Sequence, residues 1–170
     1  RRLTGPNVYF SVCGVVLEAF EEAHDDVRRA AWQSLVSQTA QALHWPAPVF
    51  HMKRHPKGAT LAFTAPLDLL YTAVEVNDWA WLSVLGQDVL FAPGHPSVTD
   101  GAYAFQTLQC LARADRQPDL MAFIDKAAEN NWPVLTDDDL ISIGYGEHVQ
   151  VWPRHEVPDL SILDAPAPPH

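Results

Sequence analysis

Apolar residues run almost all the way round one predicted helix, which extends from Pro66 to Leu85. Pro66 suits a first helical position, where no amide donor is lost, and Gly86 suits the end. At ~100° per residue the polar positions form one narrow stripe, made of Asp68, Thr72, Glu75, Trp79 and Ser83. Asn77 falls on the opposite side and is expected to be buried. A helix with so little polar surface must be covered on several sides, so the rest of the chain is predicted to wrap it.

The first third of the chain predicts turn, strand and helix in that order. Residues 3–7 have turn composition, and Val8 to Ala19 is predicted to be extended, with Gly14 as a bulge or bend. Asp25 or Asp26 suits the cap of a helix that reaches about His44. The residues expected on its inner face are Val27, Ala31, Leu35 and Leu43.

A hairpin is predicted between this helix and the apolar one. Its arms are residues 49–54 and 59–64, and the turn is residues 55–58, His-Pro-Lys-Gly. Side chains alternate along a strand, so Phe50 and Met52 are expected to face the core opposite Leu61 and Phe63.

The remainder predicts two more helices and several short strands. A short extended piece is expected at Val89 to Phe91, then a helix from an Asp100 cap to about Ala114, with Ala104, Leu108, Leu111 and Ala112 inward. The next helix begins at Pro118 and reaches about Asn130, with Leu120, Phe123, Ile124 and Ala127 inward. Strand character follows at residues 134–135, 140–143 and 149–152.

These elements predict an α+β fold, in which a mixed or antiparallel sheet packs on the long apolar helix, with further helices and a C-terminal strand pair. The expected organisation is an amino-terminal domain over residues 1–116, a helix and strand pair over 117–153, and a flexible proline-rich tail over 154–170.

Composition narrows the classes of function. Apolar residues make up 48% of the chain, enough for a core, and the formal net charge is −10. That charge argues against nucleic acid as a partner, since phosphate binding needs clustered Lys and Arg. The predicted helix from Pro66 to Leu85 carries too many charged residues to span a membrane. Two separated cysteines, Cys13 and Cys110, favour free thiols, and no secretory leader is recognisable, so a cytoplasmic location is expected.

Metal and catalytic motifs are weak. His51 and His55 lie on a strand and its turn rather than on a helix face, and His148 and His155 have no third ligand nearby in sequence. The Asp137-Asp138-Asp139 run lacks the spacing of a calcium loop. No P-loop and no nucleophile elbow occurs. We therefore predict no catalytic residue and no metal ligand in this chain, and keep a small metal-dependent hydrolase using these histidines as a remote alternative.

Basic residues offer the candidate binding positions. They form three small groups, at residues 1–2, at 28–29, and at Lys53, Arg54 and Lys57 on the hairpin. The hairpin group could hold substrate carboxylates, although solvated surface charge is the simpler interpretation. We add Asn7 and Glu75 as candidate substrate-binding residues. Glu75 and Asn77 are two positions apart on the helix, so they are not expected to act as a pair.

Three stretches in the same order resemble cyanophycin synthetases. Leu3-Thr4-Gly5-Pro6-Asn7 resembles the Leu-Arg-Gly-Pro-Asn opening of that family, and residues 73–77, Ala-Val-Glu-Val-Asn, match its Ala-Leu-Glu-Leu-Gln. Residues 124–148, with Trp132-Pro133-Val134 and Ser142-Ile143-Gly144-Tyr145-Gly146, resemble the segment that begins its ATP-grasp region.

The resemblance implies a non-catalytic, substrate- or polymer-binding front domain of an ATP-dependent amide-bond-forming ligase, most like the front of the shorter relatives called Mur ligase family proteins. ATP and Mg would then belong only to catalytic domains outside this chain, which are the implied partners in cis or trans. An amino acid or polyamide is the implied substrate, and a homo-oligomer is compatible with it.

The chain also departs from the family. Thr4 stands where the family has Arg, and Leu67, Leu70 and Tyr71 replace a frequent His-x-x-Glu-His pattern. Residues 144–148 are expected to form a plain hairpin rather than a nucleotide contact. A docking or dimerisation module, with Trp45 and Trp79 as interface anchors, remains the main alternative function.

Overall fold

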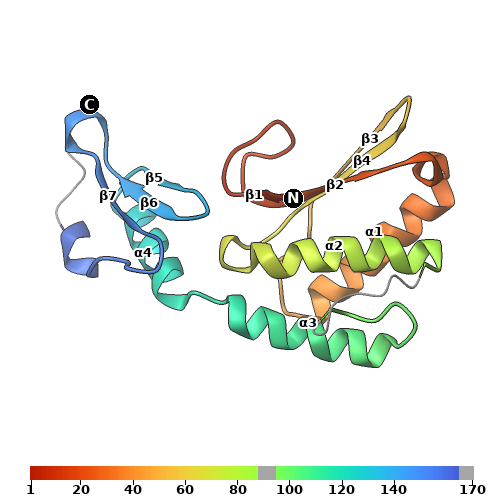
Figure 1. Ribbon diagram of the computed structural model, residues 1–170. Helices are drawn as coiled ribbons and strands as arrows, with labels where there is room; N and C mark the ends of the chain where they lie inside the picture. Colours follow the sequence, from red (N-terminus) through yellow and green to blue (C-terminus); the bar gives the residue numbers. More distant parts are fainter. Residues whose placement is uncertain (88–94, 165–170) are drawn as a thin grey trace. The chain divides into compact units, whose positions relative to one another are not determined.

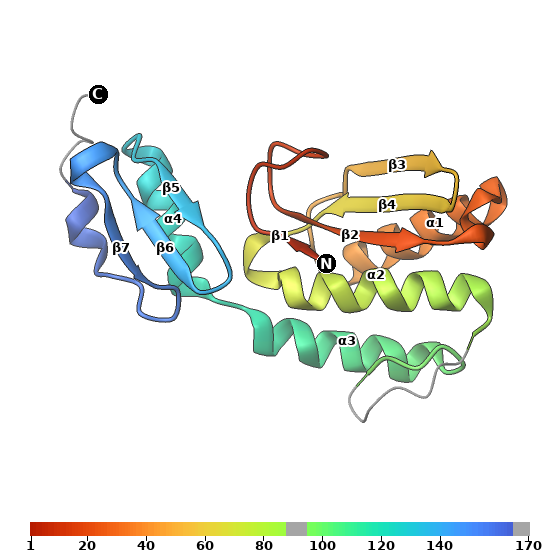
Figure 2. The same ribbon diagram turned by 45° about the horizontal axis from the view of Figure 1, so that its top comes forward.

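The predicted hairpin forms half of a four-stranded antiparallel sheet. The computed structural model describes residues 1–87 and 95–164, and the chain divides into two compact units, Arg1–Arg116 and Gln117–His170. In the first unit the strands are β1 (Arg2–Leu3), β2 (Gly14–Ala19), β3 (Phe50–His55) and β4 (Gly58–Thr64). Their order is β1-β2-β4-β3 (Figure 2). The fold of the described chain is therefore α+β, as predicted.

Three helices complete the first unit. They are α1 (Asp26–Ala42), α2 (Leu70–Leu85) and α3 (Gly101–Asp115), and 3-10 turns at Glu21–His24 and Leu67–Leu69 precede α1 and α2. Helices α1 and α2 cover one face of the sheet, and α3 packs against α2 (Figures 1 and 2). The fully buried side chains of this core include Trp32, Val36, Leu61, Phe63, Leu70 and Val76.

The opposite face of the sheet is covered near β1 by the loop of residues 4–13. Phe10 of this loop packs on Val16 of β2 and Ala62 of β4. Strand β4 is consequently buried on both sides along residues 58–63. The expected extended run from Val8 was too long, because the strand begins only at Gly14. A Cβ on Gly14 would lie 2.5 Å from the Phe63 carbonyl oxygen, so close backbone packing explains this glycine.

The inner face of α1 differs from the predicted one. Val27 is 76% exposed and Ala31 is also exposed, whereas Trp32 and Val36 are fully buried. Burying the large Trp32 indole removes far more apolar surface from water than burying an alanine, so the helix presents the Trp32 face to the sheet. Of the predicted inner residues, Leu43 is buried and Leu35 is half-buried.

The polar stripe of α2 does not face solvent. Asp68 and Thr72 are buried, and Glu75, Trp79 and Ser83 are half-buried. The Thr72 amide and hydroxyl both donate to Asp115 at the end of α3, and the Trp79 indole donates to the Ser97 carbonyl. Partners on α3 and the preceding loop thus satisfy polar groups that the sequence pattern assigned to water.

On the opposite side of α2, Asn77 is buried as predicted. Its partner is a side chain rather than the backbone, because the Trp32 indole of α1 donates to Asn77 Oδ1 at 2.9 Å. The helix ends at Gly86, which takes the left-handed conformation as expected. The extended piece predicted at residues 89–91 lies outside the described residues.

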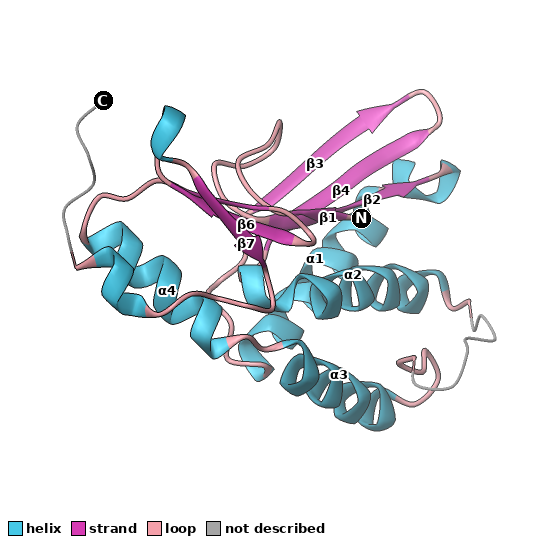
Figure 3. Ribbon diagram, turned by 60° about the vertical axis from the view of Figure 1, so that its left-hand side comes forward, coloured by secondary structure: helices cyan, strands magenta, loops and turns pink. Residues whose placement is uncertain are grey.

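The second unit packs one helix on a small antiparallel sheet. Helix α4 (Pro118–Glu129) precedes β5 (Val134–Thr136), β6 (Leu140–Ile143) and β7 (Gln150–Pro153), which pair in that order (Figure 2). Figure 3 shows α4 beside β6 and β7 from another side. The C-terminal sheet therefore has three strands rather than a pair. Its core consists of Leu120, Phe123, Ala127, Ile141, Ile143 and Leu163.

Part of the expected flexible tail belongs to this core. A 3-10 turn at Leu160–Leu163 places the Leu163 side chain fully inside. Arg154 is also buried, and it donates from Nε to Gln117 Oε1 at 3.2 Å and from Nη1 to the Asp137 carbonyl at 3.1 Å. Apolar burial and these hydrogen bonds order residues 154–164, which low sequence periodicity did not indicate.

None of the described helices has both the length and the apolar character that a membrane span requires.

Candidate functional site

A cleft of about 510 Å³ opens beside β1, between the first half of α2 and the last turns of α3. Its apolar lining comes from Val74 on α2 and from Leu111 and Ala114 on α3. Its polar lining comes from Arg1, Arg2, Tyr71, Thr72, Glu75 and Asp115. The lining therefore carries both signs of charge around an apolar floor, all within the first unit.

Arg2 and Tyr71 form one wall of the cleft. The Arg2 guanidinium carbon lies 3.6 Å from the centre of the Tyr71 ring, which is a cation–π contact. A guanidinium group has the planar donor geometry that matches a carboxylate. Tyr71 itself is 55% exposed, so an aromatic face is available to a ligand in the cleft.

Asp115 lines the cleft and has a structural role as well. Its Oδ2 atom accepts from the Thr72 amide at 2.9 Å and from the Thr72 hydroxyl at 3.1 Å. Helix α2 has no side-chain cap at its own preceding residue, Leu69. Asp115 therefore caps α2 from another helix, which places a carboxylate at the positive end of α2.

Glu75 is the second carboxylate of the cleft. Its Oε2 atom lies 2.8 Å from His95 Nδ1, so an imidazole beside the cleft orients it. Nearby, burial raises the pKa of the Asp78 carboxyl and the Glu75 carboxylate adds to the rise, while the amino group of Arg1 and His95 oppose it. Glu75 and Asp115 are the two carboxylates in the cleft lining, and they offer positions for a cationic group of a ligand.

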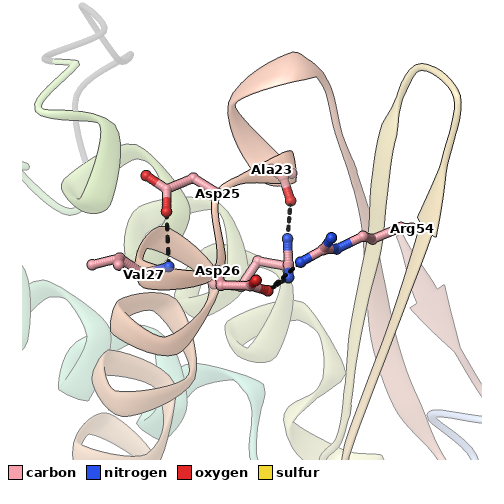
Figure 4. Close-up of polar contacts among 6 residues, drawn as sticks. Ala23, Asp25, Asp26, Val27 and Arg54 are labelled. Carbon is pink, nitrogen blue, oxygen red and sulfur yellow. Dashed lines mark hydrogen bonds and ion pairs between the residues drawn. The ribbon is translucent and has the colours of Figure 1, made fainter.

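The hairpin cations do not form a site together. Lys53 and Arg54 are neighbours on β3, so they point to opposite faces of the sheet. On the helical face, Arg54 and the buried Arg29 both pair with Asp26, at the start of α1 (Figure 4). Lys57 lies in the turn. The expected carboxylate clamp of Lys53, Arg54 and Lys57 is therefore not assembled, because the strand period separates its members.

Around the same helix start, ordinary capping accounts for the remaining polar contacts. Asp25 Oδ1 accepts from the Val27 amide at 2.8 Å, and Arg29 donates to the Ala23 carbonyl (Figure 4). Burial lowers the pKa of Arg29, with the nearby charge of Arg54 contributing. The Asp26 carboxylate offsets the repulsion between these two guanidinium groups, so the cluster ties β3 to α1.

Asn7 holds a loop rather than facing the cleft. Its Oδ1 atom accepts from the amides of Tyr9 and Phe10, and its Nδ2 atom donates to the carbonyls of Gly5 and Val12. These four hydrogen bonds use both ends of the side-chain amide. Asn7 is thus the organiser of the loop that covers the outer face of the sheet, and Glu75 is the one predicted binding residue that lines the cleft.

The histidines considered as metal ligands are separated. His51 contacts Tyr9 in a tilted geometry, with ring centres 5.0 Å apart, and His55 Nε2 lies 3.0 Å from Glu18 Oε2. His148 belongs to the other unit. Over residues 1–87 and 95–164, no three His, Cys, Asp or Glu side chains converge on a common point.

The tryptophans expected as interface anchors are engaged within the first unit. Trp45 is 7% exposed and belongs to the main core, and the half-buried Trp79 is bonded to Ser97. Trp45 is therefore not available as an anchor, and Trp79 is held by its hydrogen bond and keeps only part of its ring exposed.

The cleft residues that were not predicted differ in how far the sequence pointed to them. Residues 1–2 stood out as a basic pair, and Tyr71 stood out only as a departure from the cyanophycin synthetase pattern. Asp115 gave no signal, because the last residue of a helix is commonly polar and its contact with Thr72 spans 43 positions.

No known protein family matches the sequence, and no curated protein matches it significantly. The resemblance to cyanophycin synthetases therefore stays a prediction.

Proposed function

We propose that this chain is a non-catalytic binding domain of an ATP-dependent amide-bond-forming ligase, and that the α2–α3 cleft receives the ligase's amino-acid or polyamide substrate. The observation that supports this most is the mixed charge of the cleft, whose lining includes the cationic Arg2 and the carboxylates of Glu75 and Asp115. The resemblance to cyanophycin synthetases supplies the ligase context.

Substrate chemistry follows from the same lining. A chain of aspartate and arginine units presents carboxylates and guanidinium groups in alternation, and each finds an opposite charge in the cleft. The apolar floor lowers the local dielectric and strengthens these contacts relative to water. Tyr71 adds an aromatic face on which a guanidinium group of the substrate can stack.

In this proposal the chemistry takes place elsewhere. ATP and Mg belong to catalytic domains that act in cis or trans, and the cleft keeps a substrate end close to them by raising its effective concentration. The proposed location is the cytoplasm, where such ligases find ATP.

Calorimetric titration with short peptides tests the proposal. The ligands are a peptide of alternating Asp and Arg, an all-Asp peptide, an all-Arg peptide and a neutral Ser-Gly peptide of equal length. We expect saturable binding of the alternating peptide, and binding about tenfold weaker in Glu75→Gln, which is the loss of one charge-assisted contact. Tyr71→Leu should weaken binding several-fold by removing both stacking contacts.

Lys53→Gln is the matched control, because it changes one charge on the outer sheet face, away from the cleft. It should leave the affinity unchanged. Equal binding of all four peptides, or equal losses in Lys53→Gln and Glu75→Gln, would contradict the proposal.

A docking or dimerisation function is favoured by one observation on the second unit. On the face of its sheet away from the buried Ile141 and Ile143, Leu135, Leu140 and Val151 are 70%, 43% and 53% exposed. Exposed apolar side chains on one sheet face are typical of interfaces. Light scattering distinguishes this alternative, since a mass that stays monomeric from micromolar to millimolar protein would argue against self-association.

A further inference from the structure

A second concavity, of about 260 Å³, lies between the end of α1 and the last turns of α3. Ala42, Leu43 and Ala112 form its apolar part. The polar side chains around it are His44, Gln109, Arg113 and Arg116. This concavity shares no lining residue with the α2–α3 cleft.

The charged lining is basic only, in a chain with 21 acidic and 11 basic Lys and Arg residues. Gln109 and Arg113 are four positions apart on α3, so they project from one side of it, and Arg116 follows directly after the helix. Within residues 1–87 and 95–164, neither arginine takes part in an ion pair, and the side chains of His44 and Gln109 form no hydrogen bond. Four side chains that can donate hydrogen bonds therefore border one small space, and none of them has a partner among the described residues.

His44 reaches this position through an unfavourable backbone conformation. Helix α1 ends in a Schellman motif, in which the His44 amide donates to the Gln41 carbonyl and the Trp45 amide donates to the Ala40 carbonyl. His44 itself has a φ of +58°, a left-handed conformation in which glycine is the favoured residue. A histidine here costs stability, and an imidazole beside two arginines is a functional reason to retain it.

We propose that this concavity is a binding site for a small oxyanion, a phosphate or carboxylate group held by Arg113 and Arg116 with His44 and Gln109 as further hydrogen-bond donors. Guanidinium groups match the geometry of both oxyanions. A bound anion also offsets the repulsion between the two guanidinium groups. The simpler role of the arginines, which is to stabilise the carbonyl end of α3, needs no ligand.

The test measures binding of inorganic phosphate and of succinate to the full chain, by calorimetry at constant ionic strength with chloride as the balancing anion. We expect saturable binding of at least one of the two, at least tenfold weaker in Arg113→Gln and in Arg116→Gln. Lys53→Gln, an equal charge change on the outer sheet face, should bind as the parent does. Preference for phosphate or for succinate would identify the oxyanion class.

His44→Gly separates binding from folding. Relief of the left-handed conformation should raise the midpoint of thermal unfolding, while loss of the imidazole weakens anion binding several-fold. The proposal is overturned if neither anion binds saturably, or if all variants respond as weakly to phosphate and succinate as to chloride. It is also overturned if the arginine variants lose stability without losing anion binding, since helix stabilisation would then be their whole role.

Discussion

The two units end a helix in the same way but fill the critical position differently. In each, a Schellman motif is followed by Trp-Pro, at residues 45–46 after α1 and at residues 132–133 after α4. The left-handed residue is His44 in the first unit and Asn131 in the second, both with φ of +58°. After glycine, asparagine is the commoner residue here because its short polar side chain hydrogen-bonds locally, so we expect the same backbone to cost somewhat more in the first unit.

The two units also bury polar groups for different purposes. In the first, the Trp32–Asn77 hydrogen bond joins α1 to α2 inside an otherwise apolar core. In the second, the buried Arg154 joins the residue before α4 to the β5–β6 turn. The Trp32–Asn77 bond lies between two helices of the larger core, whereas Arg154 connects two loop residues of the smaller unit, which has less apolar area to bury.

Core truncation should give the largest difference between the units. Phe63→Ala is expected to destabilise the first unit, and Phe123→Ala the second, each by about 3–5 kcal/mol, because both rings are fully buried. Hydrogen exchange followed by mass spectrometry reports each unit separately. Exchange that rises equally in both units after either substitution would mean that they unfold together.

Loss of the buried polar links should come next. Arg154→Met is expected to cost the second unit about 2–3 kcal/mol, since hydrogen bonds from a charged group are lost while the aliphatic stem remains. Asn77→Ala should cost the first unit about 1–3 kcal/mol by leaving the Trp32 indole N–H unpaired. Urea unfolding of each variant measures these costs, and a neutral Arg154→Met would contradict the role of Arg154 as a polar link.

Glycine at the helix ends should stabilise the units unequally. We expect His44→Gly to raise the free energy of unfolding by about 0.5–1 kcal/mol, and Asn131→Gly by a few tenths, because histidine pays more for positive φ than asparagine does. Thermal unfolding of the two variants and of the parent protein measures these differences in stability. A larger gain from Asn131→Gly would reverse the ranking of the two ends.

Lowering the pH should change the stability of the two units in opposite directions, and these changes should be smaller than the effects of the substitutions above. Backbone hydrogen bonds from Asp139 and Leu140 lower the pKa of Asp137 in the second unit, and burial raises the pKa of Asp78 in the first. The Asp137 carboxylate therefore adds to the free energy of unfolding above its unfolded-state pKa, and this stabilisation is lost as the pH falls through its folded-state pKa. The native state holds the Asp78 proton more tightly than the unfolded chain does, so protonation of Asp78 stabilises the first unit increasingly as the pH falls.

Two variants check this sign. Asp78→Asn should be more stable than the parent near pH 7, with the advantage shrinking as pH falls through the aspartate range. Asp137→Asn should lose stability near pH 7, and its deficit should shrink in acid. Unfolding midpoints measured from pH 3 to pH 7 test both, and parallel curves for parent and variants would contradict the assigned shifts.

The elements that depend on local signals were predictable from the sequence. The hairpin register, the Asp100 cap and the inner faces of α3 and α4 rest on alternation, turn residues and helical period, and they match the structure. Met52 is the exception in the hairpin: it was expected in the core but is 41% exposed, on the edge strand β3. The inner face of α1 was not predicted, because the choice between the Ala31 and Trp32 faces depends on which packs better against the sheet.

The candidate cleft was predictable only in part. Glu75 belonged to a recognisable pattern, but Asp115 and Thr72 meet through tertiary packing, and no local pattern carries that contact. Lys53 and Arg54 are adjacent in sequence and therefore suggested one site, although the strand period sends them to opposite faces. Asn7 suggested binding because it is polar in a turn, where it satisfies its own loop instead.

The most direct test of the account is nitrogen–proton chemical-shift mapping of the labelled chain during titration with the alternating Asp-Arg peptide. The account predicts saturating shifts at Tyr71, Thr72, Glu75 and Asp115, and none at Lys53 and Lys57 on the hairpin. Shifts centred on the hairpin, or no saturating shifts at the α2–α3 cleft, would contradict the assignment of substrate binding to that cleft.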